Sequence, residues 1–109
     1  MANFVRGDVV VLPFPFSNLS GSKRRPALVL ADLPGADILL CQITSQATRD
    51  ALALPLTATD FASGALPVAS FIRPSRLFTA DKSIIVRKAG SLRADLQRQV
   101  VAAIVRLIS

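Results

Sequence analysis

The chain has 109 residues, of which 51% are hydrophobic, and a formal net charge of +6 from 13 Lys and Arg against 7 acidic residues. This length favours one domain, residues 1–109, with a modest core that dimerisation would enlarge, and the Arg-rich balance favours a polyanionic partner, nucleic acid or acidic protein, over charge for solubility alone. The chain has no His, which excludes Ser-His-Asp and Cys-His catalysis and a His-based metal site.

Short apolar, β-branched runs bounded by Pro, Gly and polar residues recur up to residue 86 and predict strands. Pro13 and Pro15 are expected to end the first strand, and Pro55 confines another to a sheet edge. Residues 17–23 and 57–64 are expected to be loops. The predicted strands lie at residues 9–12, 27–31, 38–43, 52–56, 66–72, 77–79 and 84–86.

Two of these strands, at residues 27–31 and 38–43, lie on either side of a Pro34-Gly35 pair. A Pro-Gly pair favours a type II turn. The two strands are therefore expected to pair as an antiparallel hairpin.

An amphipathic helix is predicted at the end of the chain. Gly90 ends the strand pattern, and Ser91 suits the N-cap of a helix. Apolar residues then recur every three or four positions and form one face, which is expected to pack against the sheet. They are Leu92, Leu96, Val100, Ile104 and Leu107. Five to seven short strands followed by one helix predict a mainly β fold, either a small barrel or a strongly curved sheet.

Three consecutive cations, Lys23, Arg24 and Arg25, stand between a Gly-Ser pair and Pro26 at the start of the hairpin. Pro26 favours extended backbone at Arg25 and suits the first position of a strand, because proline has no N–H to donate. A guanidinium held there matches a phosphate group and stays charged at any working pH.

Arg25 begins one strand of the hairpin and Thr44 ends the other, so antiparallel pairing would bring them to the same open end. A guanidinium beside a hydroxyl suits a phosphodiester, since the cation offsets charge on phosphorus and the hydroxyl holds an oxygen. RNA supplies its own nucleophile, the 2′-hydroxyl. The alternatives are a solvated surface arginine and a threonine that satisfies a backbone group, and the residues alone indicate a basic β domain that binds a polyanion.

The same stretches resemble the PemK/MazF family of toxins from bacterial toxin–antitoxin pairs, in order and over nearly the whole chain. The matching stretches are Arg6-Gly7-Asp8-Val9-Val10, residues 21–30 with Arg25-Pro26, Gln42-Ile43-Thr44-Ser45, residues 70–77, Thr79-Ala80-Asp81-Lys82, and Gly90 with the helix that follows. The resemblance implies an SH3-like β-barrel with a C-terminal α-helix that works as a homodimer.

The activity that the resemblance implies is that of an mRNA interferase. Such an endoribonuclease cleaves single-stranded RNA at short sequence motifs, without metal or cofactor, by attack of the 2′-hydroxyl, and typically leaves a 2′,3′-cyclic phosphate. The implied partner is a cognate antitoxin whose acidic tail blocks the RNA groove. The specificity loops are expected at residues 14–23 and 47–52.

The resemblance also implies roles for individual residues. The catalytic pair of the family falls on Arg25 and Thr44, and a second family arginine falls on Arg73. Some relatives carry an aspartate where this chain has Ser75, so a carboxylate base at that position is absent. Arg25 is expected to be the main electrostatic and proton-transfer group, with Thr44 positioning the phosphate. Charge stabilisation suits the guanidinium better than proton abstraction, because an arginine is a poor base at neutral pH. The expected RNA-binding residues are Lys23, Arg24, Ser45, Gln46, Arg73, Ser75 and Arg76.

Two other functions are compatible with the same sequence features. One is a non-enzymatic toxin of the same fold that inhibits a protein target such as DNA gyrase, because fold alone does not decide activity. The other is a nucleic-acid-binding module without chemistry, although a chain with six Phe and no Trp or Tyr has few stacking platforms.

The single cysteine, Cys41, lies in an apolar run and is interpreted as a small buried hydrophobe, which fits a reducing compartment. Residues 1–8 lack the apolar stretch of a signal peptide, and no run approaches the roughly 20 residues of a membrane span. A cytoplasmic protein is therefore expected.

Overall fold

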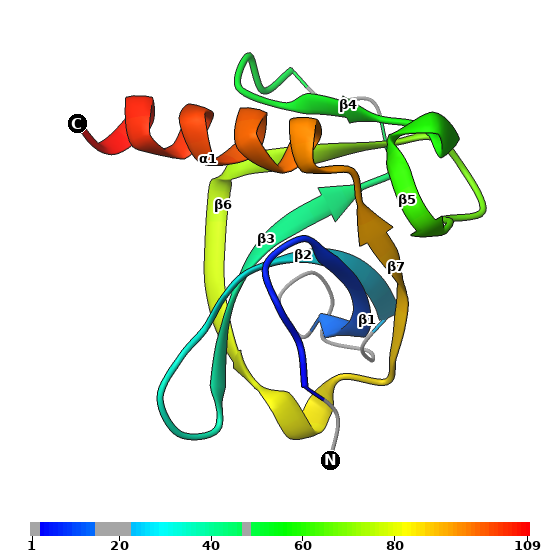
Figure 1. The fold of residues 1–109 in the computed structure, drawn as a ribbon, viewed down its shortest axis with the longest axis vertical. Helices are drawn as coiled ribbons and strands as arrows, with labels where there is room; N and C mark the ends of the chain where they lie inside the picture. The colour runs from blue at the N-terminus through cyan, green and yellow to red at the C-terminus, as the bar shows by residue number, and fades with distance from the viewer. Residues whose placement is uncertain (1–2, 15–22, 47–48) are drawn as a thin grey trace.

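The computed structural model describes residues 3–14, 23–46 and 49–109, which form one seven-stranded antiparallel sheet followed by a helix. The strand order is β4-β6-β3-β2-β1-β7-β5, and the sheet curls into a half-barrel with α1 lying across one end (Figure 1). The elements are β1 (Asp8–Phe14), β2 (Lys23–Asp32), β3 (Asp37–Thr44), β4 (Leu54–Leu56), β5 (Phe61–Gly64), β6 (Ser70–Asp81), β7 (Arg87–Leu92) and α1 (Ala94–Ile108). The predicted mainly β fold with a C-terminal helix is confirmed.

The hairpin at the centre of the sheet is also confirmed. β2 and β3 pair antiparallel, with Ala27 opposite Gln42 and Leu28 opposite Cys41. Gly35 in the connecting turn has a φ of 81°, the left-handed conformation that a type II turn requires and that glycine adopts without a steric penalty.

The two faces of the curled sheet bury two separate apolar clusters. Because side chains alternate along a strand, neighbouring residues contribute to different clusters. The cluster under α1, here the helix cluster, comprises Val9, Leu28, Cys41, Ile43, Leu56, Ile72, Leu92, Leu96 and Val100. The cluster on the other face, here the Phe4 cluster, comprises Phe4, Val10, Leu12, Ala27, Val29, Ile38 and Leu40. In β3, Gln42 and Thr44 continue the alternation of Ile38 and Leu40, so they lie on the Phe4 face.

The predicted packing of the helix is confirmed for its middle. Leu96 and Val100 are buried in the helix cluster, and Ile104 packs against it. Leu92 contributes to the same cluster from β7, whereas Leu107 is 45% exposed near the end of α1. In the described residues, no helix is both long enough and apolar enough to span a membrane.

Both strands at the start of the chain are longer than predicted. β1 continues through Pro13, which pairs with Arg24 of β2. The ladder of β1 with β7 has already ended at Val11, so Pro13 lies where one side of the strand is unpaired and the missing N–H is tolerated. β2 begins at Lys23, so the cations belong to the strand; the rest of the predicted 17–23 loop lies outside the described residues.

The prediction of a loop at residues 57–64 is wrong for its second half. Ala58–Asp60 form a 3₁₀ turn, and β5 follows and pairs with β7. Gly64, at a φ of 71°, and Gly90 allow the two backbones to approach, since a Cβ on either residue would overlap the other strand. This close pairing depends on a partner far along the chain, which local polarity does not reveal.

The predicted break at Gly90 and Ser91 is also wrong, because both residues lie within β7. The Ser91 hydroxyl donates to the buried carboxylate of Asp8 at 3.1 Å instead of capping the helix. The N-cap of α1 is Arg93, whose side chain makes no capping bond.

The predicted strand at residues 66–72 is wrong for residues 66–69, which precede β6. Its last three residues join the predicted 77–79 strand in one strand, β6, from Ser70 to Asp81. A bulge opposite the Cys41–Gln42 step inserts extra residues into β6 and accommodates the buried Pro74. The predicted strand at 84–86 is wrong: Lys82–Ile84 form a 3₁₀ turn, and β7 begins at Arg87. The predicted edge strand is confirmed, since β4 (Leu54–Leu56) is the first strand of the sheet.

Candidate functional site

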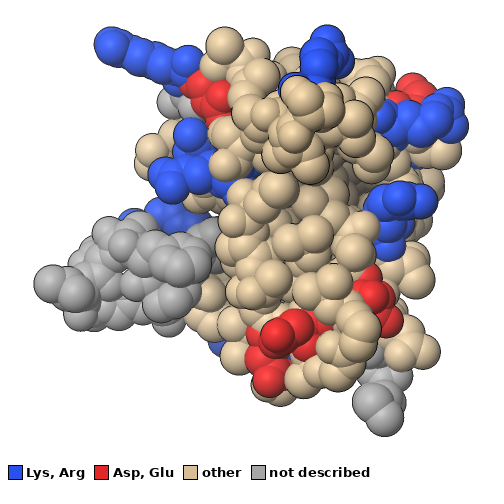
Figure 2. All heavy atoms as spheres, turned by 90° about the vertical axis from the view of Figure 1, so that its left-hand side faces the viewer, with Lys and Arg blue, Asp and Glu red and all other residues tan. Residues whose placement is uncertain are grey.

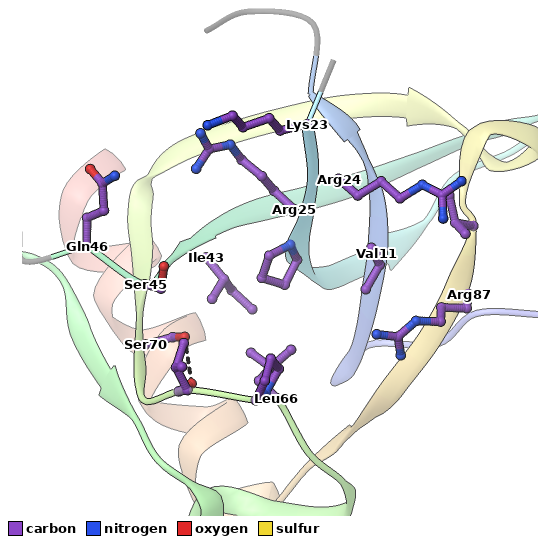
Figure 3. Close-up of a pocket in the computed structure, with 14 residues that line it drawn as sticks. Val11, Lys23, Arg24, Arg25, Ile43, Ser45, Gln46, Leu66, Ser70 and Arg87 are labelled. Carbon is purple, nitrogen blue, oxygen red and sulfur yellow. Dashed lines mark hydrogen bonds between the residues drawn. The ribbon is translucent and has the colours of Figure 1, made fainter. Parts of the chain in front are cut away.

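A cavity of about 520 Å³ opens at the end of the sheet where β2 begins and β3 ends (Figure 3). Its floor is apolar and its rim carries four cations from β2 and β7. The lining residues are Val11, Lys23, Arg24, Arg25, Pro26, Ile43, Ser45, Gln46, Leu66, Pro67, Val68, Ser70, Val86 and Arg87. This combination suits an anionic ligand that also has apolar or planar parts.

The cationic side chains enter the cavity from two sides. Figure 3 shows Lys23 and Arg25 extending from β2 along one rim, and Arg87 pointing inward from β7 on the other. Val11 of β1 is the register partner of Arg87, and Pro13 is the partner of Arg24. The sheet therefore holds these cations on β2 and β7, the two strands that flank β1. Sequence reasoning missed Arg87, because its place beside the cavity depends on the pairing of β1 with β7.

Arg25 has an unusual environment for a residue at the start of a strand. It lies opposite Leu12 of β1 and is partly buried. Among the described residues, its Nε atom is buried and has no hydrogen-bond partner. A buried polar donor without an acceptor costs about 1–3 kcal/mol, so an acceptor that reached it would recover that energy.

Thr44 lies at the end of β3 next to this group. Continuing the β2–β3 register outward by two residues from Ala27 and Gln42 brings Arg25 and Thr44 opposite one another. The half-buried Thr44 accepts a hydrogen bond at Oγ1 from the backbone N–H of Gln46 at 3.2 Å. Its neighbours Ile43 and Ser45 face the cavity, so Thr44 itself points to the Phe4 face.

The other predicted RNA-binding residues fall into two groups. Lys23, Arg24, Ser45 and Gln46 line the cavity and are exposed. Arg73, Ser75 and Arg76 lie on β6 instead, and Arg76 is exposed there.

Arg73 and Ser75 meet a residue that sequence reasoning missed, Asp50. The Arg73 Nε donates to Asp50 Oδ2 at 3.2 Å, and the Ser75 hydroxyl donates to the same oxygen at 2.8 Å. Arg73 Nη1 also donates to Gln42 Oε1 at 3.4 Å. The available signal was weak: Asp50 is the single acidic residue between Asp37 and Asp60, in a stretch predicted as loop.

These contacts lower the pKa of Asp50 below its ordinary value. The largest cause is the bond from the Leu52 backbone N–H, followed by the bond from Ser75, and Arg73 contributes further. The carboxylate is therefore ionised throughout the neutral range. In the described residues, no group of three or more Asp, Glu, Cys or His side chains could hold a metal ion.

The chain matches a known protein family over nearly its whole length. Residues 5–108 match the family model of the PemK-like, MazF-like toxins of type II toxin–antitoxin systems. A search of the curated proteins finds no sequence match.

Several solved structures share the fold. A MazE–MazF complex from Deinococcus radiodurans superposes with a TM-score of 0.77 at 23% identity, covering 99% of this chain and 97% of that chain. An endoribonuclease in complex with its cognate antitoxin, from a mycobacterial species, gives 0.75 at 13% identity over 95% and 93%. Mycobacterium tuberculosis toxin MazF-mt6 gives 0.71 at 18% identity over 91% and 93%.

Proposed function

Because the chain belongs to the PemK-like, MazF-like toxins of type II toxin–antitoxin systems, we propose that it is an endoribonuclease that cleaves single-stranded RNA without a metal ion. Similar folds occur in proteins described as an endoribonuclease in complex with its cognate antitoxin and as toxin MazF-mt6. The proposed active site is the open end of the β2–β3 hairpin, with Arg25 and Thr44 as the catalytic pair.

One observation carries this proposal: the buried Nε of Arg25 lacks an acceptor among the described residues, at the edge of a cavity with a cationic rim. A phosphate group suits a guanidinium well, because two of its oxygens can accept two parallel N–H groups. Lys23, Arg24 and Arg87 would attract the flanking phosphates of the same strand, and this attraction weakens as salt concentration rises.

The reaction needs no nucleophile from the protein. The 2′-oxygen of the RNA loses its proton and attacks the adjacent phosphorus, and the bond from phosphorus to the 5′-oxygen breaks. The 5′-oxygen takes up a proton, and the products are a 2′,3′-cyclic phosphate and a 5′-hydroxyl. Negative charge grows on the non-bridging oxygens during this step, and Arg25 would stabilise it because its guanidinium stays protonated.

Two partners are proposed, each through a different surface. The antitoxin would block the cavity with an acidic, partly apolar tail, because the cationic rim and the floor of Val11, Ile43 and Leu66 offer both kinds of contact.

The protein would act as a homodimer through the end of α1, where Val105 is 53% and Ile108 is 73% exposed. Figure 2 looks onto this side of the molecule, where uncharged side chains cover the centre.

The direct test is incubation of the purified protein with a long single-stranded RNA in excess EDTA, followed by primer extension. We expect discrete cuts at a recurring short motif and fragments that end in a 2′,3′-cyclic phosphate. Intact RNA that is retained on a filter would indicate a binding module. Intact RNA together with inhibition of DNA gyrase would indicate a toxin that acts on a protein.

A further inference from the structure

The guanidinium of Arg73 is held from two sides. Its Nε donates to Asp50 Oδ2 at 3.2 Å, and its Nη1 donates to Gln42 Oε1 at 3.4 Å. These two bonds use two of the five N–H donors of an arginine, and they fix the plane of the fork. The orientation of Arg73 thus depends on a carboxylate that lies 23 residues earlier in the chain.

The carboxylate of Asp50 is also held by hydrogen bonds other than the one to Arg73. One carboxylate oxygen accepts from the Leu52 backbone N–H at 2.9 Å, and the other accepts from the Ser75 hydroxyl at 2.8 Å. The Asp50 side chain is 10% exposed, against 22% for Arg73. A carboxylate anchored by the backbone is a rigid support, whereas a solvated ion pair would leave both long side chains mobile.

Arg73 lies on the same face of the sheet as Thr44, one member of the proposed catalytic pair. It is the register partner of Gln42, and Phe71 is the partner of Thr44. Gln42 and Thr44 are separated by one residue, so both side chains point to the Phe4 face. The pair Gln42–Arg73 and the pair Thr44–Phe71 are therefore roughly 7 Å apart along the strands. Arg73 can therefore reach a phosphate that neighbours the one held by Arg25.

Resting on the proposed ribonuclease function, we infer that Asp50 is a positioning residue that acts through Arg73. Asp50 holds the guanidinium so that its outer N–H groups bind a phosphate of the RNA next to the scissile one. Ser75 takes part by donating to Asp50, which makes its contribution indirect.

If Asp50 has this role, removal of its carboxylate should weaken RNA binding, whereas charge alone would make the same removal strengthen it. An acidic side chain beside a bound polyanion repels it, so removal of a merely nearby carboxylate would strengthen RNA binding. If Asp50 positions Arg73, its removal misplaces a phosphate contact, and both binding and turnover fall.

The test compares Asp50→Asn, Arg73→Ala and the double variant with wild type. Asp37→Asn is the matched control, because Asp37 is exposed at the far end of β3 and its loss changes the charge equally. The measurements are kcat and KM on RNA, the Kd for a 2′-O-methyl oligonucleotide that lacks the nucleophile, and the NMR signal of the Arg73 Nε–H. Circular dichroism checks folding.

Asp50→Asn is expected to lower kcat/KM by about 10-fold to 100-fold, close to the loss in Arg73→Ala, with no further loss in the double variant. The Arg73 Nε–H signal should shift in Asp50→Asn, and Asp37→Asn should match wild type. If Asp50→Asn fails to fold, Ser75→Ala carries the test and should lower kcat/KM in the same direction by a smaller factor.

Two results would overturn the inference: tighter binding of the oligonucleotide by Asp50→Asn, or losses in the two single variants that multiply in the double variant. Failure of the proposed function itself has a different signature, since the wild type would then leave RNA whole. In that case weaker oligonucleotide binding by both single variants would still support the positioning of Arg73, and tighter binding by Asp50→Asn would still contradict it.

Discussion

The backbone of Gly7 passes so close to the carboxamide of Gln97 that a Cβ at residue 7 would overlap the Nε2, Cδ and Oε1 atoms. Gly7 has a φ of 100°, its N–H donates to Val29 O at 3.0 Å, and its carbonyl accepts from Leu92 N at 2.9 Å. This contact joins the start of β1 to the first turns of α1.

The Gly7 contact predicts an unusually costly glycine substitution. Gly35→Ala serves as the matched control, since Gly35 also has a positive φ but has no atom within 4 Å of an added Cβ. We expect Gly35→Ala to lower the free energy of unfolding by about 1 kcal/mol, the cost of the left-handed backbone. Gly7→Ala should cost about 1–2 kcal/mol more, because Gln97 must move and give up its bond to Leu92 O. Urea denaturation measures both, and equal values would contradict the prediction.

Leucines on the two sides of α1 should differ sharply in their contribution to stability. Leu96 is 5% exposed within the helix cluster, so Leu96→Ala is expected to cost about 3 kcal/mol of unfolding free energy. Leu107→Ala makes the same chemical change at a site that is 45% exposed and should cost less than about 0.5 kcal/mol in the monomer. Thermal and urea unfolding of the two variants provide the measurement. A large loss in Leu107→Ala that depends on protein concentration would instead place this leucine in a dimer contact.

Cys41 is predicted to be unreactive in the folded protein. Burial raises the pKa of its thiol to about 12. The thiol also donates a hydrogen bond to the Arg73 carbonyl at 3.0 Å. Ellman's reagent at pH 8 should therefore leave Cys41 unmodified until urea unfolds the chain. Rapid labelling of the native protein would contradict this.

The same shift affects stability at high pH. The thiol binds its proton more tightly in the folded state, so its contribution is complete below the ordinary pKa of 9.0 and is lost as pH rises toward about 12. Unfolding free energy should fall across this window, and Cys41→Ala should show a shallower decline when both proteins are titrated in parallel.

The proposed catalytic pair predicts graded losses of RNA cleavage. Arg25→Ala should lower kcat by about 100-fold to 1,000-fold, the effect of removing a preorganised donor to a developing oxyanion. Arg25→Lys should recover little of it, because an ammonium lacks the planar fork. Thr44→Ser keeps the hydroxyl and should retain more activity than Thr44→Val. Single-turnover cleavage of a labelled RNA measures all four variants, and wild-type rates for Arg25→Ala and Thr44→Val would remove the pair from the site.

Much of the fold was accessible from local pattern. The Pro34-Gly35 turn, the edge strand with Pro55 and the apolar face containing Leu96 and Val100 were each predicted from neighbouring residues, because turn geometry and side-chain alternation act over a few positions. Two of the errors share one cause. β5 and the last residues of β7 pair with each other, and local sequence contains no sign of a partner some 30 residues away.

Some features of the candidate site were also predictable from local sequence, and others were not. The sequence alone determined that three cations precede Pro26 at the start of a strand and that Thr44 ends the next one, since proline and strand ends constrain the backbone locally. The tertiary structure decided that Asp50 supports Arg73, that Arg87 completes the cationic rim, and which face of β3 each side chain takes. These features depend on strand register and on packing between distant segments, and a change of one residue in register would exchange the two faces.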